Sequence, residues 1–163
     1  MPVAQMVNLC ALDEVVGLKY AVDDLRSFAQ ISDAVGARAA LVCGMAEDPA
    51  LDYLAAGAMG FSSGMANFAP RMSLAILQHF NRGNKAAAAE LRAAMVPFED
   101  LRGDNAARYS GSALHAAMER AGLAGGPVVP FAEDVASDDL PHLYRLIDRV
   151  MEREKQLSNG EGR

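Results

Sequence analysis

The chain has 163 residues, and 52% of them are apolar, which is enough for one domain with a hydrophobic core. The net charge is −6 with both signs interspersed, so neither a basic patch nor a nucleic-acid partner is expected. No apolar run reaches the roughly 18 residues that span a bilayer, and no signal-type start is present, so no membrane partner is expected. Two cysteines in apolar surroundings, Cys10 and Cys43, predict no disulfide framework and favour a reduced, cytoplasmic location.

In the first half of the chain, short apolar runs alternate with amphipathic helices. Residues 2–11 predict a helix, and the continuous apolar run Val15–Leu18 predicts a strand that is buried on both faces. Asp24 and its acidic neighbour open a helix that Gly36 ends. A second strand is expected over residues 39–43.

The next helix is expected to begin with Asp48 as N-cap and Pro49 in its first position, and to end at Gly57. A third strand follows over residues 58–62, and Pro70 begins another helix. Strands and helices that alternate in this way are typical of parallel βα units.

The second half predicts helices at 85–101, at 109–121 and after Ser137, with an extended stretch at 128–131. Pro97 is expected to kink the first of these helices. Three strands alone would leave two unpaired sheet edges, and a complete eightfold barrel takes about 250 residues, so the sequence indicates part of a larger design. The expected division is a partial α/β barrel in residues 1–83, a helical region in 84–157 and a frayed tail in 158–163.

Lys19 is the first candidate for chemistry, because it directly follows the first predicted strand. Catalytic residues of barrel enzymes lie at the C-terminal ends of the strands. Desolvation there would lower the pKa of the ammonium and make the neutral amine available as a nucleophile, and Gly17 could leave room beside it. The alternative is an ordinary lysine at a strand end that extends its ammonium to water.

Small residues follow the other two predicted strands. Gly44 could let a substrate approach the backbone closely, or it could simply make the turn into the next helix. Ser62 and Ser63 could offer hydroxyl groups to a hydroxylated acid, or they could be small residues for tight packing.

The histidines predict no metal site, because all three fall on predicted helices without metal-type spacing: His79, His115 and His142. Cys43 lies at a strand end with no base nearby in sequence, so it is interpreted as a small buried hydrophobic residue.

Taken together, these segments resemble a known family. Val15–Lys19 resembles the motif around the Schiff-base lysine on the sixth strand of the dihydrodipicolinate synthase / N-acetylneuraminate lyase family. Cys43-Gly44, residues 49–61 and residues 67–70 match the seventh and eighth units of that family in order. Residues 109–130 look like its C-terminal helical region and proline-bearing crossover. The resemblance covers almost the whole chain and implies an α/β fold: the last three βα units of a TIM (β/α)8 barrel, followed by helices.

The resemblance implies a pyruvate-type 2-keto acid or keto-deoxy sugar acid bound as an imine to Lys19, with no metal or organic cofactor. Gly44 would make a backbone contact near the substrate, and Ser62, with Ser63 beside it, would contact the lysine or the substrate. Residues 61–64 look more like the sugar-acid branch, 5-dehydro-4-deoxyglucarate dehydratase. The usual form of the family is a homotetramer, so a homo-oligomer is expected.

Two parts of the family pattern have no counterpart in this sequence. They are the glycine-threonine loop after the second strand, which binds the carboxylate, and the proton-relaying tyrosine of the fifth strand. Tyr20 should point to the side of the strand opposite Lys19, so it is not assigned that role. A second hypothesis is therefore a non-catalytic barrel fragment that acts as an assembly module and self-associates through its sheet edges. A third alternative is a flavodoxin-like binding domain. It ranks last, because such a domain needs more strands and a ligand loop that the sequence does not show.

Overall fold

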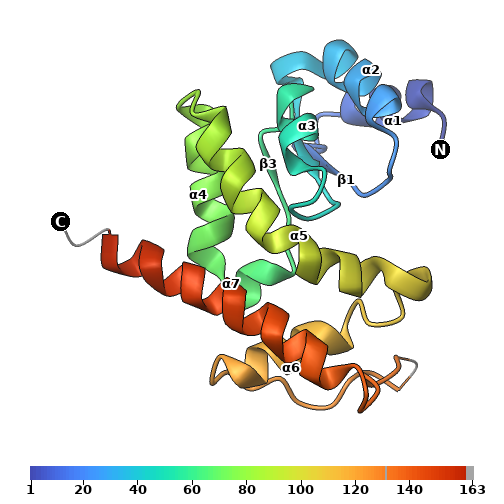
Figure 1. Ribbon diagram of the computed structural model, residues 1–163. Helices are drawn as coiled ribbons and strands as arrows, with labels where there is room; N and C mark the ends of the chain where they lie inside the picture. The colour runs from blue at the N-terminus through green and yellow to red at the C-terminus, as the bar shows by residue number, and fades with distance from the viewer. Residues whose placement is uncertain (131, 161–163) are drawn as a thin grey trace. The chain divides into compact units, whose positions relative to one another are not determined.

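The computed structural model describes residues 1–130 and 132–160, and the chain divides into two compact units, Met1–Ser63 and Gly64–Arg163 (Figure 1). The first unit contains, in chain order, α1 (Val3–Cys10), β1 (Gly17–Tyr20), α2 (Leu25–Val35), a 3-10 turn (Gly36–Arg38), β2 (Ala40–Cys43), α3 (Ala50–Ala55) and β3 (Gly60–Phe61). The predicted alternation of strands and helices is confirmed. The predicted boundaries at residues 83 and 157 stay predictions.

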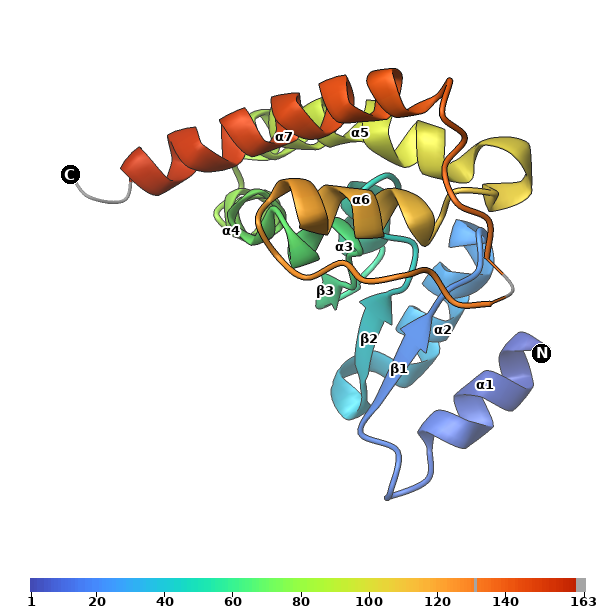
Figure 2. The same ribbon diagram turned by 90° about the horizontal axis from the view of Figure 1, so that it is seen from below.

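The three strands form one parallel sheet in the order β1-β2-β3 (Figure 2). Lys19 pairs in register with Val42, and Val42 pairs with Gly60. Among the described residues, no strand pairs with the outer edge of β1 or of β3. The sheet of this unit therefore has two open edges.

An aromatic cluster fills the space between the sheet and its helices. The ring of Tyr20 lies 5.5 Å from that of Phe28 in α2 and 6.3 Å from that of Tyr53 in α3, and Phe28 lies 4.9 Å from Tyr53. All three side chains are buried, as are Leu41 and Cys43 on β2. Because side chains alternate along a strand, this packing places α2 and α3 against the face of the sheet opposite Lys19.

The prediction that the first strand is buried on both faces is wrong, since Gly17 and Lys19 are exposed. Within the first unit, the helices that cover the sheet lie on the face of Tyr20. The strand also begins later than expected: it starts at Gly17, where pairing with Ala40 starts, so Lys19 lies inside β1 and not after it.

The local signals for helix ends are mostly confirmed. Asp24 caps α2, its Oδ1 accepting the backbone N–H of Ser27 at 2.9 Å, and Gly36 ends the helix with a φ of +55°. At α3 the expected N-cap, Asp48, is wrong. The N-cap is Pro49, which makes no side-chain hydrogen bond to the helix.

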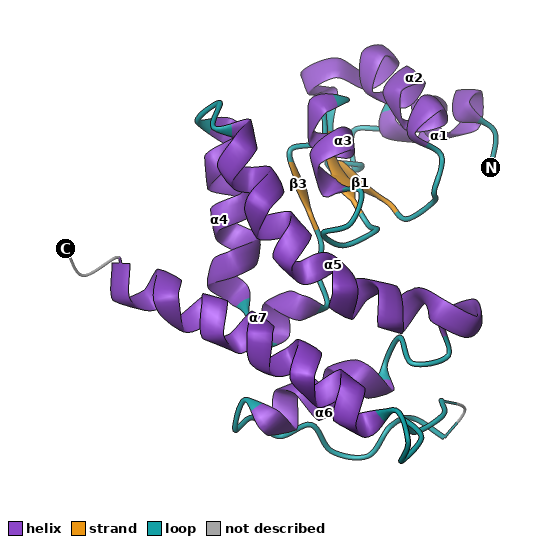
Figure 3. Ribbon diagram, viewed as in Figure 1, coloured by secondary structure: helices purple, strands orange, loops and turns teal. Residues whose placement is uncertain are grey.

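The regular elements described in the second unit are all helices, joined by loops (Figure 3). It contains a 3-10 turn (Met65–Asn67), α4 (Pro70–Asn81), α5 (Lys85–Ala107), α6 (Ser112–Arg120) and α7 (Leu140–Gly160). The prediction that Ser137 caps the last helix is wrong, because α7 begins three residues later, at Leu140. Residues 128–130 form no strand, and Phe131 lies outside the described residues.

The core of the second unit lies among α4, α5 and α7. Its fully buried side chains come from all three helices: Met72, Ile76, Met95, Phe98, Leu143 and Ile147. In α4 the buried side chains are Met72, Ser73 and Ile76, whereas Leu74 is 55% exposed. α5 continues through Pro97 to Ala107, beyond the expected end at Leu101.

One buried carboxylate fastens α7 to the start of α4. Glu154 accepts the backbone N–H groups of Arg71 at 3.1 Å and Met72 at 2.9 Å, and its Oε1 lies 3.3 Å from the Arg71 guanidinium. Ala69, the N-cap of α4, has no side chain that can accept such bonds. Glu154 therefore supplies the cap from a distant helix.

Candidate functional site

Lys19 lies on the open face of the first unit's sheet. The alternation of side chains places Lys19 and Ala21, Val42 and Gly44, and Ser62 on this face, in three neighbouring chain segments. Most of these residues are small, so that Lys19 is the one long side chain among them. Its side chain is exposed and free to reach a molecule that approaches this face.

Gly44 lies directly beside Lys19. The backbone N–H of Gly44 donates to the carbonyl of Tyr20 at 2.7 Å, which continues the pairing of β1 with β2. A Cβ added to Gly44 would lie 2.7 Å from the Cβ of Ala21 and 3.0 Å from the Cε of Lys19. Only a residue without a side chain leaves the present space for the lysine, so the structure brings these two predicted site residues together.

The two serines lie one strand further along the sheet. The backbone N–H of Ser62 donates to the carbonyl of Cys43 at 2.8 Å, which places Ser62 level with Gly44 at the C-terminal edge of the sheet. Ser62 and Ser63 are both half-buried. Lys19, Gly44 and Ser62 thus follow one another across the same edge.

An apolar hollow of about 350 Å³ borders Lys19 on the other side, along the open edge of β1. Its wall comes from α1, from β1 and from the loop after β1, and it includes Met6, Leu9, Leu18 and Val22. Lys19 carries the only charged side chain among the residues that line this hollow. The amine therefore stands between an apolar wall and the open sheet face.

The loop after β1 is held by a residue that sequence reasoning missed. The hydroxyl of Tyr53 donates to the carbonyl of Val22 at 2.7 Å and accepts the N–H of Asp24 at 3.2 Å. Burial raises the pKa of Tyr53, so the hydroxyl stays protonated and able to donate. No sequence signal marks this residue, because a tyrosine on a short helix has no distinctive spacing.

Cys43 does not contribute a nucleophile to this edge. It is fully buried, and burial raises the pKa of its thiol, so the reactive thiolate is disfavoured. This agrees with its interpretation as a small hydrophobic residue. Cys10 is also buried and free.

The histidines lie in the second unit, on α4, α6 and α7. In the described part of the chain, no three His, Cys, Asp or Glu side chains are grouped so that they could hold a metal ion. None of the described helices is long and apolar enough to cross a membrane.

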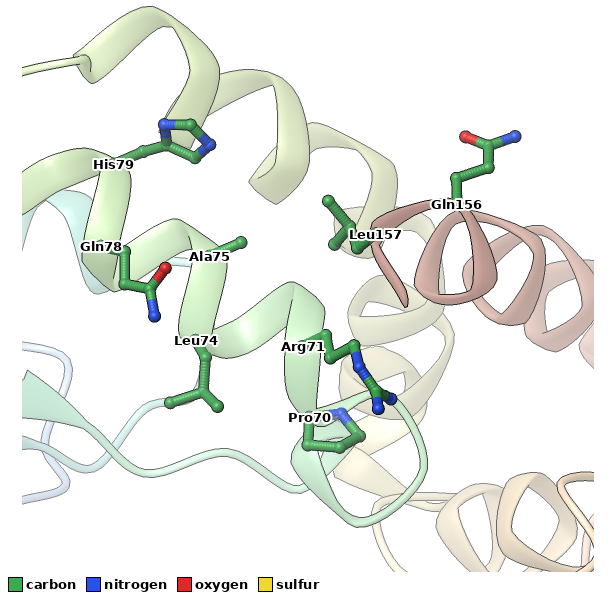
Figure 4. A pocket seen from close by; sticks show the side chains of 8 residues that line it. All are labelled: Pro70, Arg71, Leu74, Ala75, Gln78, His79, Gln156 and Leu157. Carbon is green, nitrogen blue, oxygen red and sulfur yellow. The ribbon is translucent and has the colours of Figure 1, made fainter. Parts of the chain in front are cut away.

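A hollow in the second unit is formed by α4 and the end of α7, and Figure 4 shows the side chains that line it. Its volume is about 530 Å³. Its lining side chains are Pro70, Arg71, Leu74, Ala75, Gln78, His79, Gln156 and Leu157. Its cationic member, Arg71, is bound to Glu154, which serves the packing of these two helices. We assign no chemistry to this hollow.

The sequence of the chain is similar to that of a known protein family. The model of the "Dihydrodipicolinate synthetase family" matches residues 1–149. A protein of Arthrobacter sp. (strain FB24), named "Probable 5-dehydro-4-deoxyglucarate dehydratase", is 30% identical over 141 residues, which are 85% of this chain and 46% of that protein.

Two crystal structures of dihydrodipicolinate synthase are similar in fold. The one from Oceanobacillus iheyensis has a TM-score of 0.82 at 33% identity and covers 88% of this chain and 48% of that one. The one from Bacillus clausii has a TM-score of 0.83 at 30% identity, over 88% and 49% of the two chains. The chain therefore spans about half the length of the relatives it matches.

Proposed function

Since the chain belongs to the dihydrodipicolinate synthetase family, as its sequence led us to expect, we propose that it carries the lysine of a Schiff-base lyase or dehydratase. The substrates would be pyruvate-type 2-keto acids or keto-deoxy sugar acids, bound as an imine to Lys19. The observation that carries this proposal is the close approach of Gly44 to the Cε of Lys19 on an open, small-residue sheet face.

The proposed chemistry begins at the amine of Lys19. The neutral Nζ of Lys19 attacks the keto carbon, a carbon–nitrogen bond forms, and the carbonyl oxygen leaves as water. The protonated imine then withdraws electrons from the neighbouring carbon. Loss of a proton from that carbon to water gives an enamine, which expels a protonated β-hydroxyl group as water. In the alternative, the β-hydroxyl group loses its proton to water, the carbon–carbon bond breaks, and an aldehyde leaves. Gly44 would leave room for the bound acid, and the hydroxyls of Ser62 and Ser63 would bind its polar groups.

We further propose that β1, β2 and β3 are the last three strands of a (β/α)8 barrel, with Lys19 facing the interior. The parallel order, the helices on the opposite face and the two open edges of the described sheet support this architecture. Desolvation of the amine requires cover over the open face, which the described elements of the first unit do not supply. Full turnover would therefore need the additional strands that the longer relatives have room for.

The sugar-acid branch is the more specific form of the proposal. Relatives at 30% identity are named "Probable 5-dehydro-4-deoxyglucarate dehydratase", and the serine hydroxyls beside the sheet edge suit a hydroxylated acid. The reaction would then be a dehydration. The homo-oligomer and the cytoplasmic location expected from the sequence stay predictions.

Borohydride reduction with pyruvate or 5-dehydro-4-deoxyglucarate, followed by peptide mass spectrometry, tests the proposal. We expect a reduced adduct on Lys19, which Lys19→Arg abolishes. The two other lysines, Lys85 and Lys155, act as internal controls in the same digest. An adduct spread equally over all three lysines would show non-specific amine chemistry and would defeat the proposal.

A second candidate function is a non-catalytic assembly module, which the two open sheet edges favour. It predicts self-association through these edges and no preference of the keto acid for Lys19. The trapping experiment therefore separates the two candidates.

A further inference from the structure

We propose that the second unit holds a separate binding site for a small organic dication such as an alkyl diamine. The site is a hollow of about 570 Å³, formed by α6, by the loop that follows it and by the start of α7. The residues that carry the argument are Ser112, His115, Glu119, Asp134 and Tyr144, all in its lining. The proposal does not depend on the role of Lys19.

The hollow is built by a close approach of the loop to α6. Ser112, His115 and Glu119 are spaced three and four residues apart, so they lie on one face of the helix. A Cβ added to Gly125 would lie 2.6 Å from the carbonyl oxygen of His115 and 2.7 Å from the Cγ of Glu119. The loop thus passes directly over this face because Gly125 has no side chain.

A buried hydroxyl group in the lining lacks a partner. Ser112 is only 4% exposed, and its Oγ makes no hydrogen bond to any described residue. A buried polar group left in this way costs about 1–3 kcal/mol, so nearly all such groups in proteins find a partner. The hydroxyl group has almost no accessible surface, so a ligand in the hollow would supply that partner after a small shift of the atoms that cover it.

Three other polar side chains of the lining can accept hydrogen bonds: those of His115, Glu119 and Asp134. The Nδ1 of His115 lies 3.0 Å from the carbonyl oxygen of Gly126, and because a carbonyl only accepts, Nδ1 must carry the proton. In the neutral ring, Nε2 is then an acceptor. The carboxylates of Glu119 and Asp134 accept as well, and Ser112 can do so.

The charge of the lining selects the sign of the ligand. None of the residues that line the hollow is a lysine or an arginine. Arg120 lies over the ring of Tyr144 at 4.9 Å, but it is bound to Asp148 through contacts of 2.5 and 2.7 Å. The carboxylates of Glu119 and Asp134 therefore remain available to a ligand that is positively charged and rich in donors. Two carboxylates in a hollow of this size favour a dication over a single ammonium ion.

The test is a titration of the full chain with three four-carbon ligands of matched length at one salt concentration. We expect 1,4-diaminobutane to bind saturably and to shift the NMR signals of α6 and of the following loop. Both 1,4-butanediol and succinate should bind at least about tenfold more weakly, because they lack the positive charge. A tenfold difference corresponds to about 1.4 kcal/mol.

Variants locate the site. Glu119→Gln and Asp134→Asn should each weaken diamine binding by about tenfold, and Ser112→Ala by a smaller factor. Asp138→Asn removes an exposed acid that does not line the hollow and should leave binding unchanged. If Ser112→Ala does not fold, the two charge variants decide the matter. Absence of saturable diamine binding, equal binding of the diol, or binding that both charge variants leave intact would overturn the proposal.

Discussion

The backbone of Gly44 approaches the stem of Lys19 so closely that a Cβ on the glycine would lie 3.0 Å from the Cε of the lysine. The same Cβ would lie 2.7 Å from the Cβ of Ala21, a contact that real side chains do not make. The lysine therefore takes its present position only while position 44 has no side chain. The relationship links two strands and gives the proposed site a sharp mutational test.

Gly44→Ala should displace the side chain of Lys19 and strain the strand pair. We expect the rate of borohydride trapping at Lys19 to fall by about tenfold or more, with a loss of stability of roughly 1–3 kcal/mol from overpacking. Gly60→Ala, at a position on the same sheet, is the matched control, because a Cβ there would have no atom within 4 Å beyond its own residue and its two chain neighbours. Equal behaviour of the two variants would mean that the close contact has no influence on the amine.

Tyr53→Phe should loosen the loop after β1 without emptying the aromatic cluster. The change removes the hydroxyl that bonds Val22 and Asp24 but keeps the ring against Phe28. We expect the free energy of unfolding in urea to fall by about 1–2 kcal/mol, because the change removes two part-buried hydrogen bonds. Hydrogen exchange should rise at residues 21–24. Tyr144→Phe, which removes a hydroxyl from the second unit, should change neither quantity.

Alkaline pH should destabilise the first unit through its buried tyrosines. Burial is the main cause that raises the pKa of Tyr20 and of Tyr53 above the ordinary value of 10.0. The folded state then holds protons that the unfolded chain has already released. The stability that these protonated hydroxyl groups contribute is complete below the ordinary pKa of 10.0, which applies to the unfolded chain. It is lost as the pH rises through the higher pKa values of the folded state.

The measurement is the free energy of unfolding at pH values from about 8 to about 12, a range that brackets the ordinary pKa of tyrosine. Tyr53→Phe should show a shallower alkaline loss than the unchanged chain. Identical slopes would contradict the assignment of this loss to Tyr53.

Glu154→Ala should destabilise the second unit at the junction of α4 and α7. The change leaves the N–H groups of Arg71 and Met72 without their acceptor, and we expect a cost of about 1–3 kcal/mol. Thermal unfolding measures the effect. Glu152→Ala, an exposed position on the same helix, is the control and should stay within about 0.5 kcal/mol.

The open edges of the sheet should make the isolated chain self-associate. Two apolar side chains flank these edges, Val16 at 78% exposure before β1 and Met59 at 70% exposure before β3. The double variant Val16→Lys with Met59→Lys should lower the mass measured by light scattering, because charges at an edge oppose strand pairing. Leu74→Lys changes an exposed leucine on a helix and should leave the mass unchanged. A chain that is already monomeric would argue against the assembly-module function.

The sequence predicted the elements of the first unit where a local cause sets them. The alternation of apolar runs and helices, the cap at Asp24 and the stop at Gly36 follow from neighbouring residues alone. The opposite directions of Lys19 and Tyr20 follow from the geometry of any strand. The family, too, could be identified from short motifs in order, because these motifs are local.

Other features had no local cause. The strand of Lys19 was expected to be buried on both faces, but burial depends on which elements cover a sheet, and α2 and α3 cover the face of Tyr20. The cap of α4 comes from Glu154, which no spacing rule connects with Arg71 or Met72. The anchoring of the loop after β1 by Tyr53 depends likewise on a contact between distant segments.

The amino-acid sequence by itself thus determined the order of the elements and the ends of several helices, and it pointed to the lysine that we propose for imine chemistry. These depend on dihedral preferences, side-chain alternation and composition over a few residues. The tertiary structure alone decided that Gly44 lies against the stem of Lys19 and that the amine borders an apolar hollow. Register and packing between segments far apart in the chain set those distances, and no local pattern encodes them.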